Sequence, residues 1–265
     1  MSLPQTTDLQ SRCDLLRSLH TPGAPLLLPN AWDAATARAV VAAGYPVVAT
    51  TSVGVAGALG HEDHEAPAEE MLAAAARIAR SVEVPVTVDA EAGYGMEPAE
   101  LVAALRNAGA AGCNLEDSEP ADHSLRDPDA QATWLAGVRA AATADGYGLV
   151  INARVDVFFG PLLAGAAPGT QEDLVPEALR RANAYLDAGV DCVYPIGLWE
   201  RDALRSFMAG VHGPVNIVPM PPAFAPDMPS VEELAALGVA RVSWAIFLYQ
   251  QAMAHVEGLL ASLPR

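Results

Sequence analysis

The chain has 265 residues, which suits one large α/β barrel or two small domains. Its residues are 52% apolar and 18% charged, a composition that provides a sizeable core and argues against disorder. Acidic residues outnumber Lys plus Arg by 32 to 15, a formal charge of −17, so nucleic acid and anionic membranes are not expected as partners.

The elements can be predicted in chain order, because an Ala-rich helical stretch repeatedly ends at a glycine that a β-branched run follows. A helix over 8–19 comes first, in an N-terminal extension (1–22) that either plugs a barrel bottom or packs on its side. Eight strands are expected within 25–30, 41–50, 83–91, 106–117, 147–156, 186–197, 213–220 and 235–245. Helices are predicted near 32–43, 67–81, 97–108, 129–144, 172–188, 199–209, 230–237 and 245–262, with a long loop over 158–174.

Strict alternation of strands and helices implies a parallel sheet, and short continuous apolar strands are typical of burial on both faces. Eight such units without a linker fit a closed (β/α)8 TIM barrel, with residues 1–265 as one domain, better than an open doubly wound sheet. Neither GxGxxG nor GxxxxGK[ST] occurs, so a nucleotide-binding alternative has no support.

The spacing of the three cysteines indicates the redox state of the compartment in which the protein is expected. Cys13, Cys113 and Cys192 lie far apart and form neither a metal-binding pair nor a disulfide framework. The N-terminal stretch has no apolar signal core, and no apolar run reaches membrane-spanning length. A cytoplasmic protein is therefore expected, with Cys113 and Cys192 as small core residues inside strands.

Charged side chains gather at the carboxyl ends of the expected strands, where barrels of this kind place their active sites. Asp89 and Glu91 end the third strand on one face, because side chains alternate along a strand. Glu116 ends the fourth strand, Arg154 lies at the end of the fifth, and Asp63 follows the second. A hard divalent cation, Mg²⁺ or else Mn²⁺, would offset the repulsion among these carboxylates. The alternative is that the acids cap helices or pair with Arg154.

For three further polar residues, the sequence gives weaker indications of a role in the site. His61 and His64 lie in a polar loop beside Asp63, where solvent exposure is the default and a substrate contact or a proton role is the alternative. Tyr94 follows a strand end in a Gly-flanked turn, so a role in the site and a role in packing are both open.

With these motifs in place, the sequence resembles the isocitrate lyase / phosphoenolpyruvate mutase superfamily, from about residue 25 to 255. VDAEAGYG (88–95) is similar to the superfamily's VDADTGYG, and LED (115–117) ends the next strand. TSVGVAGALGHED (51–63) matches the substrate-loop region, and NARVD (152–156) matches the arginine strand.

The resemblance implies a barrel of the phosphoenolpyruvate/pyruvate-binding type and a set of roles. It makes Asp89, Glu91 and Glu116 the Mg²⁺ shell, partly through water, with Asp89 also meeting the substrate. Asp63 would lie near the metal and the substrate, and Arg154 would bind the substrate carboxylate or an enolate oxygen. Three residues would supply backbone N–H groups and a hydroxyl to the same carboxylate: Thr51, Ser52 and Val53.

The sequence also departs from the superfamily pattern. Glu91 stands where an Asp is usual, Ala92 follows in place of Thr, and the KKCGH loop and the mutase-like gating Lys are absent. YPIG (194–197) lacks the acid of the methylisocitrate lyases, which argues against authentic isocitrate or methylisocitrate lyase activity. HSLRD (123–127) and VNIVPM (215–220) lean toward the mutase and phosphonopyruvate hydrolase branch.

Three functions are compatible with these residues. The first is an Mg²⁺-dependent enzyme that cleaves a C–C bond in a 2-oxo acid or a 2-hydroxy di- or tricarboxylate through an enolate. Asp63, His123 or a metal-bound water would move the proton, and Tyr94 is a further catalytic candidate. The second is C–P chemistry, as in phosphonopyruvate hydrolase or phosphoenolpyruvate mutase. The third is a catalytically degenerate, metal-dependent 2-oxo-acid-binding protein.

The C-terminal helix (245–262) is strongly apolar for a surface helix, so it should cover its own barrel or a neighbour's. The resemblance implies that subunits exchange this helix in a homo-oligomer, a dimer or tetramer.

Overall fold

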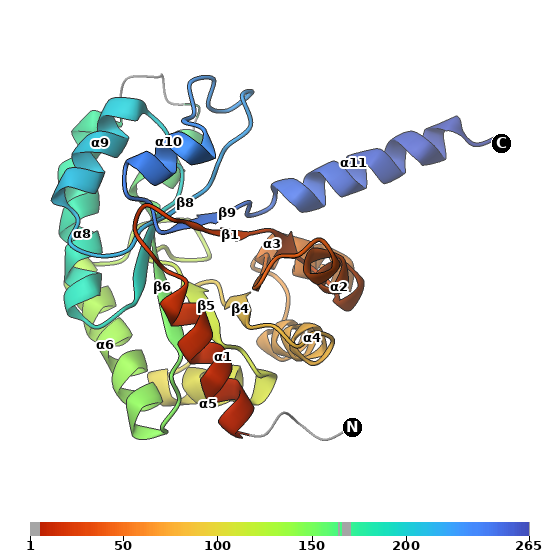
Figure 1. The fold of residues 1–265 in the computed structure, drawn as a ribbon, viewed down its shortest axis with the longest axis horizontal. Coiled ribbons are helices and arrows are strands. Elements are labelled where there is room, and N and C mark those ends of the chain that lie inside the picture. The colour runs from red at the N-terminus through yellow and green to blue at the C-terminus, as the bar shows by residue number, and fades with distance from the viewer. Residues whose placement is uncertain (1–5, 164, 166–170, 265) are drawn as a thin grey trace.

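A ring of parallel strands forms the centre of the fold (Figure 1). The structure, a computed structural model, describes residues 6–163, 165 and 171–264. Six strands pair in the order β2-β3-β4-β5-β6-β7, and three more pair in the order β1-β9-β8. These strands are β1 (Leu26–Leu28), β2 (Asn30–Ala31), β3 (Val48–Thr50), β4 (Val86–Asp89), β5 (Gly112–Leu115), β6 (Val150–Val155), β7 (Cys192–Pro195), β8 (Asn216–Ile217) and β9 (Arg241–Ser243).

Two short links close the ring. A parallel bridge between Val193 and Val215 joins β7 to the start of β8. On the other side, β1 and β2 are one strand interrupted at Pro29, whose first half pairs with β9 and whose second half pairs with β3. The predicted (β/α)8 barrel is therefore confirmed, with the first of its eight strands split at a proline that has no N–H to donate to the ladder.

Helices cover the outside of the ring at the predicted places. They are α2 (Ala34–Ala42), α4 (Ala68–Arg80), α5 (Pro98–Ala108), α6 (Pro128–Ala144), α8 (Val175–Asp187), α9 (Arg201–Gly210) and α10 (Val231–Ala236). In α4 the buried residues include Met71, Ala75 and Ile78, which share one face at helical spacing. Gly109 then ends α5 in the left-handed conformation (φ 77°) and turns the chain into β5.

The first helix, α1 (Thr6–Ser18), closes the amino-terminal end of the barrel. Its Leu16 is fully buried, and the Arg17 guanidinium donates to the backbone oxygens of Gly148 and Leu149, just before β6. Arg17 also pairs with Asp191 at 2.8 Å, just before β7. Of the two placements open for this extension, the bottom plug is the observed one; residues 1–5 lie outside the described residues.

Several short elements were not predicted. Helix α3 (Ser52–Leu59) follows β3 directly, and in the segment expected as a loop over 158–174 the structure has α7 (Phe159–Leu163) and two short turns, η1 (Asp156–Phe158) and η2 (Glu172–Leu174). Residues 164 and 166–170 of that segment lie outside the described residues. Helix α3 contains glycines where neighbours come close: a Cβ on Gly54 would lie 2.9 Å from the Cβ of Trp32. Packing against neighbours, rather than helix propensity, stabilises this helix.

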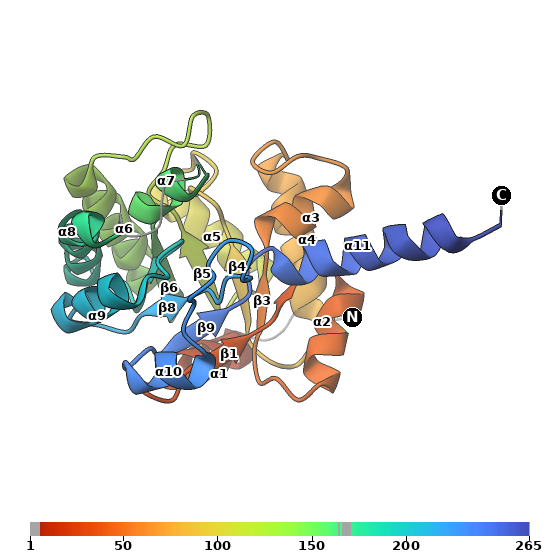
Figure 2. The same cartoon turned by 90° about the horizontal axis from the view of Figure 1, so that it is seen from above.

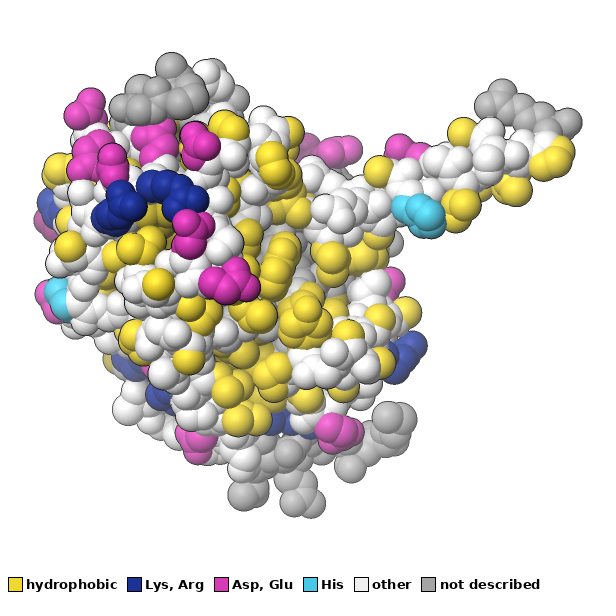
Figure 3. Space-filling view, turned by 45° about the horizontal axis from the view of Figure 1, so that its top comes forward, with side chains coloured by type: hydrophobic (Ala, Val, Ile, Leu, Met, Phe, Trp, Pro, Cys, Tyr) yellow, Lys and Arg dark blue, Asp and Glu magenta, His cyan; other side chains and the backbone are white. Residues whose placement is uncertain are grey.

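The last helix, α11 (Phe247–Ser262), leaves the barrel as an arm (Figures 1 and 2). Its first turn packs on the body, where the Tyr249 and Trp32 rings lie 5.3 Å apart, but none of its residues is buried. Hydrophobic side chains run along the arm (Figure 3), among them Val256, Leu259 and Leu260, which are exposed by 43%, 54% and 61%. Within the described part of the chain, no helix combines the length and the apolar character needed to cross a membrane.

Candidate active site

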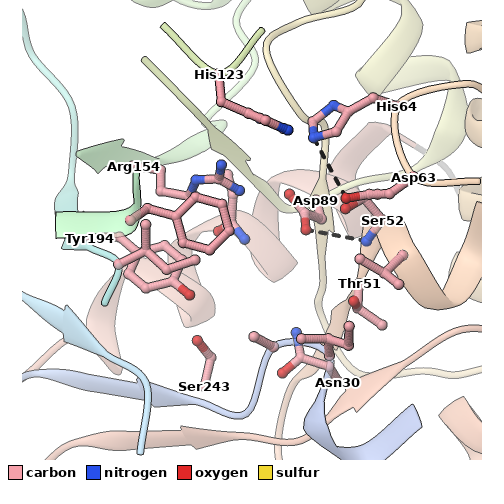
Figure 4. A pocket seen from close by; sticks show the side chains of 16 residues that line it. Asn30, Thr51, Ser52, Asp63, His64, Asp89, His123, Arg154, Tyr194 and Ser243 are labelled. Carbon is pink, nitrogen blue, oxygen red and sulfur yellow. Dashed lines mark hydrogen bonds and ion pairs between the residues drawn. The ribbon is translucent and has the colours of Figure 1, made fainter. Parts of the chain in front are cut away.

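A pocket of about 290 Å³ opens at the carboxyl ends of the strands (Figure 4). Of the residues predicted for the site, seven line it: Thr51, Ser52, Val53, Asp63, Asp89, His123 and Arg154. The others that line it were not predicted as site residues or were given only a minor role: Asn30, His64, Asn114, Phe159, Tyr194, Ile196, Ser243, Ala245 and Ile246. The closed barrel thus brings side chains from both halves of the sequence into one pocket.

Asp89 lies at the end of β4 and faces the start of α3. Its carboxylate Oδ2 accepts a hydrogen bond from the Ser52 backbone N–H at 3.2 Å (Figure 4). Its own N–H donates to the Thr50 hydroxyl at 2.8 Å. Burial raises the pKa of Asp89, and the guanidinium of Arg154 opposes that rise. Asp89 has no ion-pair partner within 4.0 Å among the described residues, so its charge is poorly compensated.

His64 lies among three carboxylates. Its Nδ1 is 3.3 Å from Glu91 Oε2, and its Nε2 is 3.5 Å from Asp63 Oδ2 and 3.6 Å from Glu116 Oε1. The close contact with the Glu91 carboxylate, supported by the charges of Glu116 and Asp63, raises the pKa of His64 to about 9. The imidazole is therefore a cation at neutral pH. Both His64 (φ 63°) and Glu91 (φ 51°) adopt the left-handed backbone region, which residues with a Cβ rarely occupy.

Arg154, at the end of β6, is the second cation of the cluster. Its Nη1 lies 2.6 Å from Glu116 Oε2, and its Nε and Nη2 donate to the two oxygens of Asp156 at 2.7 and 2.6 Å. The side chain is nearly buried, and the Phe159 ring lies 5.4 Å from the guanidinium carbon. Burial raises the pKa of Glu116 to about 7, although Arg154 and His64 oppose that rise.

His123 reaches the pocket from an exposed loop between β5 and α6. Its ring meets the His64 ring edge-on at 5.9 Å, and its backbone is also left-handed (φ 57°). The loop is fastened by a bridge between Ser118 and Leu125. The prediction that His123 belongs to the site is thus compatible with its position.

Glu91 and Glu116, predicted as metal ligands, do not themselves line the pocket but contact His64, which does. Two other polar side chains near strand ends take positions outside the pocket. Tyr94 does not line the pocket, and its hydroxyl is 3.4 Å from the Asp89 backbone oxygen, so its position favours support of β4 over a catalytic role. Asp33, one of the acids that follow a strand, caps α2 through the Thr36 N–H at 2.7 Å. Here the alternative of helix capping is the correct one, because this acid precedes a helix rather than facing the pocket.

The acids do not form a ready-made ligand set. Among the described residues, no three His, Cys, Asp or Glu side chains converge as a metal site, since His64 lies between Glu91 and Glu116. Their chemistry nevertheless fits a hard cation. Oxygens of Asp63 and Glu91 are buried without a hydrogen bond, and four carboxylates here, with Asp89 and Glu116, exceed the two cations His64 and Arg154. Mg²⁺ held partly through water is compatible with this arrangement.

The missed residues carried signals in the sequence. Asn114 precedes Glu116 by two positions, and Asn152 precedes Arg154 by two, so the alternation that pairs Asp89 with Glu91 also puts both asparagines on the inner face. His64 had only its neighbour Asp63 to indicate it, because no periodic pattern governs a loop.

Comparisons with known proteins agree with this architecture. The family described as "Phosphoenolpyruvate phosphomutase" matches residues 16–263. The chain is 34% identical over 226 residues to the uncharacterized protein Rv1998c of Mycobacterium tuberculosis, covering 85% of this chain and 79% of the relative. It is 30% identical over 240 residues to the "Probable 2-methylisocitrate lyase 1" of Corynebacterium glutamicum, covering 89% and 76%.

Solved structures show the same fold. A "putative phosphonomutase" from Burkholderia cenocepacia J2315 has a TM-score of 0.87 and 41% identity, covering 95% of this chain and all of that one. An oxaloacetate acetylhydrolase in complex with oxalate has a TM-score of 0.80 at 22% identity, covering 95% and 86%, a likeness that shows the fold alone.

The fold and the pocket define a (β/α)8-barrel enzyme whose acids and arginine lie at the carboxyl ends of the strands. The chain belongs to the phosphoenolpyruvate phosphomutase family, within the isocitrate lyase / phosphoenolpyruvate mutase superfamily, as a lyase-like member. The resemblance inferred from VDAEAGYG (88–95) and the motifs around it is confirmed.

Proposed function

We propose that the protein is an Mg²⁺-dependent enzyme that binds a small 2-oxo acid beside Asp89 and Arg154 and cleaves a C–C bond through an enolate. The observation that carries this proposal is the meeting of two carboxylates, Asp63 and Asp89, and a permanently charged guanidinium in the lining of one pocket of about 290 Å³. A 2-oxo acid is complementary to such a pair, because it carries an anionic carboxylate next to an oxygen that a cation can polarise.

The chain's own residues would bind and orient the substrate. The Arg154 guanidinium already binds the carboxylates of Glu116 and Asp156. The carboxylate of a ligand would compete for the same N–H donors. Val53 lines the pocket, and its backbone N–H, in the first turn of α3, has no acceptor within that helix. It would donate to the same carboxylate. His123 and Asp63 also line the pocket, and both have ionisable side chains. Either of them would hold or move the proton that the reaction transfers.

Asp89, Glu91 and Glu116 would hold the metal, in part through water, with Mn²⁺ as an alternative to Mg²⁺. A bound divalent cation supplies Lewis-acid stabilisation of the negative charge on an enolate oxygen. Two features support this assignment: Asp89 has no cationic partner within 4.0 Å among the described residues, and buried oxygens of Asp63, Glu91 and Glu116 accept no hydrogen bond.

The charge of the pocket favours C–C over C–P chemistry. Arg154 is the only Lys or Arg among the described residues that line it, and the chain contains no lysine at all. A phosphonate or a tricarboxylate carries more negative charge than Arg154 and His64, which already pair with acids, can offset. Relatives include an "Oxaloacetate decarboxylase" of Rhodopseudomonas palustris, 32% identical over 155 residues that cover 57% of this chain and 50% of that protein.

The test is turnover of oxaloacetate, 2-methylisocitrate and phosphonopyruvate by the purified protein, with Mg²⁺ and with excess EDTA. We expect cleavage of a C–C substrate that EDTA abolishes, followed as release of pyruvate or of oxalate. Turnover of phosphonopyruvate alone would replace the proposal with C–P chemistry. Binding of all three without turnover would identify a catalytically degenerate binding protein.

We place the protein in the cytoplasm as a homo-oligomer. All three cysteines are buried and unpaired, which suits a reducing compartment. The apolar arm α11 needs a partner surface, and a second copy of the chain is the partner expected from the resemblance. Light scattering should show a dimer or tetramer that Leu259→Glu with Leu260→Glu dissociates, whereas Gln251→Glu on the same helix leaves it intact. A monomeric wild-type protein would refute this assembly.

A further inference from the structure

A second layer of polar side chains lies one step below Glu91, Glu116 and Arg154 along their strands. Asp89, Asn114 and Asn152 are neighbours across β4, β5 and β6, with their Cα atoms in register. Because each precedes a cluster residue by two positions, all three face the barrel interior one layer deeper. Asn114 therefore lies between Asp89 and Asn152, and it lines the pocket while only 8% of it is exposed.

The amide of Asn114 has one possible orientation. Its Oδ1 accepts from Asn152 Nδ2 at 2.9 Å and from Arg241 Nη2 at 3.0 Å. A guanidinium has donors and no acceptor, so the Asn114 atom that faces Arg241 must be the oxygen. The Nδ2 of Asn114 is then the free end of the amide, and it has no acceptor among the described residues.

Arg241 is an unusual partner for a neutral amide. It is fully buried on β9, and it has no carboxylate within 4.0 Å among the described residues. Its Nε and Nη1 have no described hydrogen-bond partner, and its Nη2 donates to Asn114 on β5. Burying an uncompensated charge is destabilising, so a contribution to folding does not explain this residue. Its contact with Asn114 offers a functional explanation.

We propose that Asn114 is a ligand-binding residue whose Nδ2–H donates to an oxygen of the acid bound beside Asp89, and that Arg241 and Asn152 are positioning residues that fix its amide. This inference rests on the proposed function and names the feature of the substrate that is recognised. A 2-oxo, enolate or 2-hydroxy oxygen accepts from Asn114, whereas the ammonium of a 2-amino acid has only donors to offer. The pocket thus selects 2-oxo acids against amino acids of the same size.

Asn114→Asp tests the donor with little change in shape. We expect the affinity for oxalate with Mg²⁺, measured by calorimetry, to fall about 10- to 100-fold, because an acceptor replaces the donor. The same substitution gives Arg241 a carboxylate partner, so the thermal midpoint should hold or rise. Thr87→Val is the control: Thr87 is buried with an unpartnered hydroxyl, faces the interior on β4 and does not line the pocket, and its oxalate affinity should stay within about twofold of the wild type.

The positioning role has a separate readout. Arg241→Met should weaken oxalate binding about tenfold at a temperature where the variant is folded, since the amide is then free to rotate, and Arg241→Lys should restore most of the affinity. Equal affinities in Arg241→Met and Arg241→Lys would overturn the positioning role. If Asn114→Asp does not fold, Asn114→Ser removes the Nδ2–H and leaves only the hydroxyl of a shorter side chain in its place.

Two outcomes separate this inference from the proposed function. If Asn114→Asp and Asn114→Ser bind oxalate as tightly as the wild type, this inference is overturned and the proposed function is not. Wild-type protein that binds neither oxalate nor pyruvate with Mg²⁺ would overturn the proposed function and this inference with it.

Discussion

Arg154→Met should lower the free energy of unfolding by about 3–5 kcal/mol and weaken the binding of oxalate at least about 100-fold. The loss of stability follows because Arg154 pairs with two acids, Glu116 and Asp156, that are 2% and 3% exposed. Both carboxylates would remain buried without that cation. The loss of affinity follows because the guanidinium is the only one described in the pocket. Urea unfolding at pH 7 and calorimetry with Mg²⁺ measure the two effects.

Arg181 provides a matched control on helix α8. It is 5% exposed, donates to Asp117 at 3.0 Å and to Glu177 at 2.7 Å, and does not line the pocket. Arg181→Met should therefore cost a similar free energy of unfolding and leave the oxalate affinity of the folded protein unchanged. Equal affinities in Arg154→Met and Arg181→Met would mean that Arg154 acts only in folding.

A compensating change separates the two roles of Arg154 further. Asp156→Asn added to Arg154→Met removes one of the two uncompensated carboxylates while its amide can still accept from Ser118, whose hydroxyl lies 2.6 Å from Asp156. Stability should recover in part, whereas binding should not, because no guanidinium is restored.

The barrel could be predicted because each local signal agreed with the global fold. Glycines such as Gly109 end helices in a conformation that other residues adopt at a cost, and strands buried on both faces read as continuous apolar runs. The positions of Asp89, Glu116 and Arg154 followed from the rule that such barrels gather their sites at the carboxyl ends of the strands. The strand split at Pro29 is a local consequence of a missing N–H.

The rest depended on contacts between segments far apart in the sequence. Helix α3 has two glycines in eight residues, a poor helix by propensity, and it forms where Gly54 and Gly57 let Tyr249 of α11 approach. The place of His64 depends on a left-handed backbone that the surrounding acids stabilise. The link from Arg241 to Asn114 spans 127 positions and crosses the barrel, so no local pattern could indicate it.

Asp89→Asn should abolish activity and leave the stability of the protein intact, the opposite of the result expected for Arg181→Met. Turnover and Mg²⁺-dependent oxalate binding should fall at least about 100-fold, since the amide cannot hold a divalent cation as a carboxylate does. The free energy of unfolding should stay the same or rise by about 1–2 kcal/mol. Asp89 has a carboxylate whose pKa is raised by burial, and its Oδ2 accepts only one described hydrogen bond, from the Ser52 N–H, which the amide oxygen can also accept.

Asp191, at the opposite end of the barrel, shows what the same substitution does to a purely structural acid. It pairs with Arg17 at 2.8 Å and with Arg139, and it accepts from the Ile151 N–H at 2.8 Å. Asp191→Asn should lower the free energy of unfolding by about 1–3 kcal/mol and leave turnover of the folded enzyme unchanged. If Asp89→Asn instead behaves like Asp191→Asn, with stability lost and oxalate binding kept, Asp89 belongs to the scaffold and the metal must be held elsewhere. Comparing the two variants therefore tests the assignment of the site directly. Both replace an aspartate with an asparagine, and they differ only in the end of the barrel at which the substitution is made.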